Sequence, residues 1–138
     1  HPLNSFLHQV VLRRRGIPVT MCILYYLVAD RCGIDLVPIS LPGHFMLGCY
    51  MDEEPFYIDA FHHGSFHTQE DVEQLLRSQY LEPEPSNFFP VPTGHVLMRI
   101  CRNLINQYSK ENDFSRVDTF KEFLQAFQSA YENHAGSE

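Results

Sequence analysis

Three side chains in this 138-residue sequence have the types and the order that thiol-based acyl transfer requires. Cys22 lies inside an apolar segment that follows Gly16, and His44 and Asp59 lie in two later segments with strand character. The start of a helix stabilises a thiolate, because its free N–H groups and its dipole favour negative charge. A histidine can then accept the thiol proton, and an aspartate can fix the tautomer of that histidine. The pattern indicates a cysteine, histidine and aspartate site.

Cys22 also fits a second interpretation, in which it is a small buried hydrophobic residue. It lies about one turn, or ~6 Å, beyond Pro18 along the expected helix, where the help of the dipole has faded. Thr20 lies nearer the helix start, but its hydroxyl needs a committed base and commonly caps a helix locally. Cys49 is five positions from His44 on one strand, so the two side chains point to opposite faces.

The hydrophobic periodicity predicts an α+β domain in which helices and strands are segregated. Gly16 separates two N-terminal helices, and Pro18 suits the first turn of the second one. This second helix is apolar on most faces, so we expect it to be buried all round, against a small antiparallel sheet. The expected N-terminal elements are helices over residues 5–15 and 18–32, strands over residues 36–39, 44–50 and 56–61, and a polar loop over residues 62–67.

The C-terminal half is expected to be helical. Thr68 and Asp71 form the pattern of a capping box, which predicts a helix that continues to Tyr80. Four prolines between Glu82 and Pro92 predict an irregular connection, and two amphipathic stripes then predict a helical hairpin like those of repeat proteins. The expected organisation is a core over residues 1–81, the connection over residues 82–92, the hairpin packed on the core over residues 93–133, and a frayed tail over residues 134–138.

Composition and charge argue against several classes of partner. The formal net charge of −7 disfavours a nucleic-acid-binding surface, which needs clustered lysine and arginine. The longest apolar run, residues 19–29, is shorter than the ~20 residues of a membrane span. The four cysteines show neither paired motifs nor zinc spacing. We therefore expect a cytoplasmic protein without membrane or nucleic-acid partners, and the abrupt start at His1 suggests a fragment of a longer chain.

Three histidines close together raise the question of a metal site. His62, His63 and His67 all lie in the expected polar loop, but Gly64 and Ser65 break the spacing that puts two ligands on one helix face. No cysteine lies near enough in the sequence to assist. The sequence therefore predicts a polar loop, with no metal and no cofactor.

Several motifs in the chain are similar to those of a known family. The runs RRRGIP, LPGHF and YIDAF, with the tail motif LEPEPSNFF, together resemble the transglutaminase-like domain of bacterial Sir-B-type proteins. A relative of that domain occurs in a vertebrate F-box-only ubiquitin-ligase receptor. The resemblance covers nearly the whole chain and implies a papain-like fold, with catalytic cysteine, histidine and aspartate in that order. It places the nucleophile at Pro18, the histidine at His44 and the aspartate at Asp59.

The resemblance implies that the usual chemistry is lost, because proline has no nucleophilic side chain. The favoured hypothesis is a non-catalytic, regulatory domain that binds a protein or peptide, with Thr20, His44 and Asp59 as candidate binding residues. The alternative is a papain-like cysteine hydrolase or acyltransferase that uses Cys22 from an unusual position. A third hypothesis places partner binding on the C-terminal hairpin alone. A link to ubiquitin is not carried over, since these residues contain no F-box.

Overall fold

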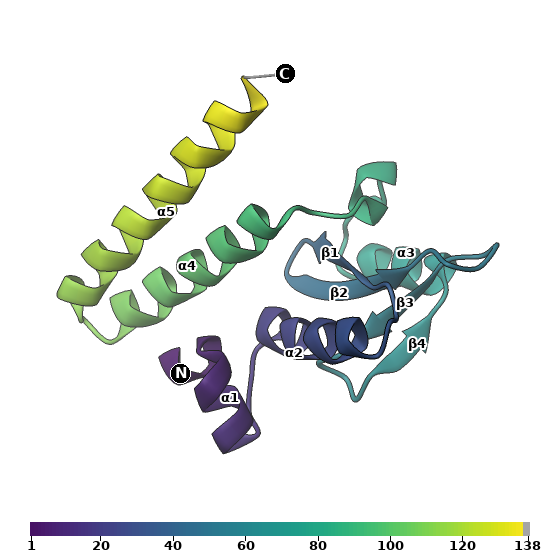
Figure 1. Cartoon of the computed structure of the whole chain (residues 1–138), viewed down its shortest axis with the longest axis horizontal. Coiled ribbons are helices and arrows are strands. Elements are labelled where there is room, and N and C mark those ends of the chain that lie inside the picture. Colours follow the sequence, from purple (N-terminus) through teal and green to yellow (C-terminus); the bar gives the residue numbers. More distant parts are fainter. Residues whose placement is uncertain (137–138) are drawn as a thin grey trace. The chain divides into compact units, whose positions relative to one another are not determined.

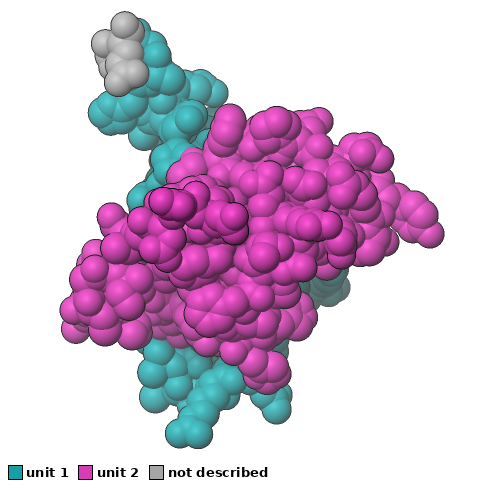
Figure 2. Space-filling model, turned by 90° about the vertical axis from the view of Figure 1, so that its right-hand side faces the viewer, with its two compact units in different colours: residues 1–15, 92–138 teal, residues 16–91 magenta. Residues whose placement is uncertain are grey.

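The computed structural model describes residues 1–136, and the chain forms two compact units, which Figure 2 colours separately. One unit comprises Gly16–Val91, and the other comprises His1–Arg15 together with the chain from Pro92 onward. This division differs from the sequence-based one, because residues 1–15 group with the C-terminal helices. The packing of the hairpin on the core stays a prediction. The last two residues of the expected frayed tail lie outside the described residues.

The unit Gly16–Val91 is built on a four-stranded antiparallel sheet in the order β1-β2-β3-β4 (Figure 1), which confirms the α+β class. Helices α2 and α3 both contact strands of this sheet. The bounds of its elements are α2 Pro18–Arg31, β1 Val37–Leu41, β2 His44–Cys49, β3 Phe56–Asp59, β4 Ser65–His67, α3 Gln69–Ser78 and the short helix η2 Pro85–Phe88.

Side-chain alternation gives the sheet two different apolar faces. Met46 of β2 and Tyr57 of β3 belong to one buried cluster with Val72 and Leu76 of α3. Ile58 of β3 instead lines a hollow together with residues of α2. We call the first the α3 face of the sheet and the second the α2 face.

Helix α2 begins where the sequence predicts but is less buried than predicted. Pro18 is its first residue, and Thr20 closes the first turn, because its hydroxyl accepts from the Ile17 N–H at 3.0 Å and donates to the Ile17 carbonyl at 3.1 Å. The second half is open to solvent, and Val28 is 63% exposed. The expectation of burial all round is therefore wrong for this half, since within the unit the sheet covers one side of the helix.

The expected polar loop contains a strand that the sequence pattern does not reveal. Ser65–His67 form β4, which pairs antiparallel with β3, so that Phe66 lies opposite Ile58. His63 and Gly64 both have positive φ in the intervening turn, and the Gly64 N–H donates to the Asp59 carbonyl. A Cβ on Gly64 would also lie 2.7 Å from the Tyr25 hydroxyl, so glycine is required for a close approach as well as for the turn.

The other unit is helical, and its hairpin agrees with the prediction. It contains the short helix η1 Pro2–Ser5, α1 Leu7–Arg13, α4 Thr93–Lys110 and α5 Phe114–Ala135. Leu104 and Tyr108 of α4 pack with Val117 of α5, and the Asp113 side chain caps α5 by accepting from the Arg116 N–H. Within residues 1–136, none of the helices combines the length and the apolar character needed to cross a membrane.

Candidate functional site

His44 and Asp59 meet at the end of two neighbouring strands, as the sequence predicts. Antiparallel pairing of Leu47 with Ile58 places Asp59 diagonally across from His44 on the α3 face. The His44 Nε2–H donates to Asp59 Oδ2 at 2.8 Å, and both residues are buried. A carboxylate only accepts, so this contact fixes the hydrogen of a neutral His44 on Nε2.

Asp59 also holds the turn that follows β3. Its Oδ1 accepts the backbone N–H groups of Phe61 and His62, each at 3.1 Å, and its Oδ2 accepts His62 Nδ1–H at 2.8 Å. Burial alone would raise the pKa of Asp59, but hydrogen bonds from His62 and His44 outweigh it and leave the pKa below its ordinary value. Asp59 is therefore the ionised centre of a group of three side chains.

His62 is the third member of this site, and the sequence pattern does not predict its contact with Asp59. His62 follows Asp59 by three residues, and a tight turn is what brings its ring back to the carboxylate. The spacing of three residues between Asp59, at the end of β3, and His62 is a sequence signal for such a turn. The turn itself depends on the pairing of β4 with β3.

Cys22 is not a member of this group of three side chains. Its side chain is 1% exposed, and its thiol donates to the Phe45 carbonyl at 3.3 Å. Cys22 belongs to α2, whereas His44 is on the α3 face of the sheet with Met46. Cys49 is also buried and alternates away from His44, as predicted. Cys22 is therefore a buried residue that is hydrogen-bonded to the backbone of β2.

The other two positions singled out in α2 have structural roles. Pro18 is the first helical residue, where its missing N–H leaves no hydrogen bond unmade. Thr20 is 0% exposed and caps the helix through the two contacts with Ile17. Its hydroxyl therefore stabilises the start of α2, and a binding role for Thr20 stays a prediction.

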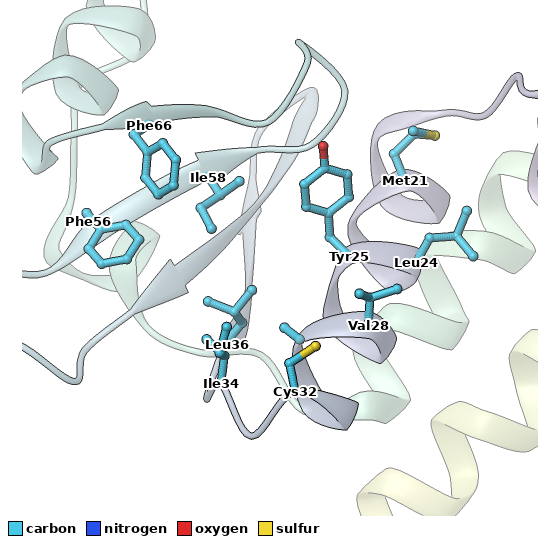
Figure 3. Close-up of a pocket in the computed structure, with 11 residues that line it drawn as sticks. Met21, Leu24, Tyr25, Val28, Cys32, Ile34, Leu36, Phe56, Ile58 and Phe66 are labelled. Carbon is cyan, nitrogen blue, oxygen red and sulfur yellow. The ribbon is translucent and has the colours of Figure 1, made fainter.

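Two pockets open on the two faces of the sheet, each with a volume of about 530 Å³. The pocket on the α3 face, called the polar pocket here, is lined by His44, Asp59 and His62 among others. The pocket on the α2 face, called the apolar pocket, is shown in Figure 3, where Tyr25 lies on the α2 side and Ile58 and Phe66 lie on the sheet side. The complete lining of the apolar pocket is Met21, Leu24, Tyr25, Val28, Ala29, Cys32, Ile34, Leu36, Phe56, Ile58 and Phe66.

Comparison with known proteins points to one family. Residues 1–102 match the family model described as the transglutaminase-like superfamily. F-box only protein 21 of Homo sapiens is 31% identical over 137 residues, which cover 94% of this chain and 21% of that protein. A UPF0162 protein of Xylella fastidiosa is 32% identical over 122 residues, which cover 84% of this chain and 43% of that protein. A UPF0162 protein of Vibrio cholerae is 37% identical over 74 residues, 53% of this chain and 27% of that protein.

The chain thus spans less than half the length of these curated relatives. No solved structure matches it. The matches to both the bacterial and the vertebrate proteins agree with the resemblance seen in the motifs.

Proposed function

This chain belongs to the transglutaminase-like superfamily, and we propose that it is a non-catalytic member that binds a protein or peptide partner in a regulatory role. The observation that carries the proposal is that the Cys22 thiol is buried and does not belong to the group of donor atoms formed by His44, Asp59 and His62. Pro18 occupies the position that the resemblance assigns to the nucleophile. Cys22 is buried and bonded to the Phe45 carbonyl. The histidine and aspartate then act as a hydrogen-bonded link between strands.

The alternative, a cysteine hydrolase or acyltransferase that uses Cys22, faces two physical obstacles. An attacking thiolate needs a base within about 3 Å of its proton and a path for the substrate. The Cys22 thiol gives its hydrogen to a backbone carbonyl and is 1% exposed. We therefore favour the non-catalytic function. A reducing compartment such as the cytosol is part of the same proposal, because Cys32 is an exposed free thiol.

Alkylation of the native protein tests this assignment. With iodoacetamide near neutral pH, we expect Cys22 to react at least about 100-fold more slowly than Cys32, because a buried thiol reacts only through transient opening. Trypsin cleavage after Arg31 separates the two cysteines, so mass spectrometry can follow each one.

Two controls define the outcome. The protein unfolded in urea should lose the contrast between the two cysteines. In the native protein, Cys101 serves as a buried thiol whose pKa is raised by burial. Alkylation of Cys22 that is faster than that of both Cys32 and Cys101 would restore the enzyme hypothesis.

We place the partner-binding surface at the apolar pocket. Among its lining residues, the Tyr25 hydroxyl and the Cys32 thiol are the only polar side-chain groups. Phe66 at its rim is 70% exposed, and Val28 on the helix side is 63% exposed. Such a concave apolar surface suits the aliphatic or aromatic side chain of a peptide. The supported partner is therefore a peptide segment with at least one large apolar anchor.

Selection from a random peptide library tests this surface. We expect the selected peptides to carry a large apolar residue and to bind Phe66→Ser at least tenfold more weakly than the unchanged chain. Phe123→Ser is the matched control, because Phe123 is a half-exposed phenylalanine on α5. The proposal would lose the apolar pocket if both variants lost the same affinity for the peptides. The same holds if the selection yielded no peptide with saturable binding.

A further inference from the structure

Three side chains in the polar pocket present metal-binding atoms to one another. His44 Nε2, Asp59 Oδ2 and His62 Nδ1 all lie within 4.8 Å of each other. We propose that this triad binds a divalent transition-metal ion, with Zn²⁺ as the ion of best fit. The sequence-based expectation of no metal considered His62 only with His63 and His67, whereas the structure joins it to residues of β2 and β3.

The donor set selects the class of ion. Two imidazole nitrogens and one carboxylate oxygen suit zinc and its neighbours, whereas calcium and magnesium prefer sites made of oxygen alone. Zinc sites with three protein ligands commonly hold water in the fourth position. Here the polar pocket, which Ser65, His67 and Asp71 also line, offers room for that water.

The distances from Asp59 Oδ2 to the two ring nitrogens require only a small adjustment. Each ring nitrogen lies 2.8 Å from Asp59 Oδ2. With metal–ligand bonds of about 2.0 to 2.1 Å at tetrahedral angles, two donors lie about 3.3 Å apart. Each ring must therefore move away from the carboxylate by about 0.5 Å. The His62 side chain is 65% exposed, so its ring can make this movement freely.

The carboxylate is already held in a suitable orientation. Asp59 Oδ1 accepts two backbone N–H groups of the turn, which leaves Oδ2 directed at both rings. Hydrogen bonds of this kind orient metal ligands and improve affinity. Asp59 would therefore bind the ion through Oδ2 alone, while Oδ1 keeps its contacts with the turn.

When both imidazoles are neutral, metal binding changes the tautomer of each ring and releases no proton. In the hydrogen-bonded triad, neutral His44 carries its hydrogen on Nε2 and neutral His62 carries its hydrogen on Nδ1. Coordination uses the lone pairs of those same nitrogens. The hydrogen of His44 therefore moves to Nδ1 and that of His62 moves to Nε2, through exchange with solvent. The ion replaces both contacts to Asp59 Oδ2.

Titration of the chelator-treated chain with ZnCl₂ tests the proposal. We expect one saturable equivalent by calorimetry, with NMR signals of the imidazole rings of His44 and His62 shifting together. His62→Asn should weaken binding at least tenfold, because it removes one of three ligands but leaves the buried pair intact. His63→Asn is the matched control, since His63 is the exposed neighbour outside the triad and asparagine tolerates its positive φ.

Three results would each overturn the inference. These are the absence of saturable binding, equal affinities of the His62→Asn and His63→Asn variants, and shifts at other imidazoles such as His1 or His8 while His44 stays unchanged. Any of them would mean that the triad serves as a hydrogen-bond group alone. The alkylation of Cys22 is measured without added metal, so failure of the metal site and failure of the proposed function are distinguishable.

Discussion

Replacing Asp59 with alanine is expected to lower the free energy of unfolding by about 3 to 4 kcal/mol, because it removes the common acceptor of a buried group. The change leaves the His44 ring buried without its partner, and it frees two backbone N–H groups in the turn before β4. Urea unfolding at neutral pH, followed by circular dichroism, measures the loss.

Asp71→Ala is the matched control for this effect. Asp71 also accepts a backbone N–H, that of Thr68, but it is exposed at the first turn of α3. We expect its replacement to cost much less stability, because the Asp71 side chain is exposed to solvent. If the two alanine variants lose equal stability, the Asp59 group is not the anchor of β3 and β4 described above.

The effect of Asp59 should also depend on pH. Because the folded-state pKa of Asp59 is lowered, its contribution is fully present above the unfolded pKa of about 3.9 and is lost as the pH falls through the lower folded value. The difference in unfolding free energy between the unchanged chain and Asp59→Ala should therefore narrow below pH ~4. A difference that grows under acid would contradict the ionised state assigned to Asp59.

Tyr57→Ala is expected to lower the free energy of unfolding by about 4 kcal/mol. The change removes the largest fully buried side chain of the sheet unit and leaves a cavity. The Tyr57 ring packs 5.4 Å from the ring of Phe88 and 6.2 Å from that of Tyr50, measured between centroids. The loss therefore includes the contact that ties η2 to the sheet.

Tyr57→Phe separates the ring from the hydroxyl. The Tyr57 hydroxyl lies 3.3 Å from that of Tyr50, and burial raises the pKa of Tyr57, so the group stays neutral. We expect this variant to lose about 1 kcal/mol, because the Tyr50 hydroxyl keeps its hydrogen bond to the Phe88 carbonyl. Chemical denaturation compares the two variants, and a Tyr57→Phe loss as large as that of Tyr57→Ala would refute the packing argument.

The parts of the fold with a strong local signal could be predicted from the sequence. Pro18 at the start of α2 and the Thr68–Asp71 capping box both have their predicted roles. Strand β4 could not be predicted, because three residues are too few to establish a period of two. The exposure of Val28 was also missed, since a pattern that is apolar all round cannot tell which side a neighbouring element leaves uncovered.

The candidate site was predictable in part. The resemblance and the strand pairing both bring His44 and Asp59 together. His62 joins them through a turn that depends on positive φ at His63 and Gly64, a feature set by the pairing of β4 with β3. The face on which Cys22 lies depends on which side of the sheet α2 packs, and local sequence periodicity does not contain that information.

Strand β4 has one more consequence, because its three consecutive residues serve both faces of the sheet. Phe66 lines the apolar pocket, while Ser65 and His67 line the polar pocket. Because alternate residues of a strand face opposite sides of the sheet, the backbone position of β4 sets part of the lining of both pockets. A molecule that binds in one pocket and shifts the backbone of β4 would therefore change the lining of the other pocket. Binding in the two pockets is therefore expected to be coupled through β4.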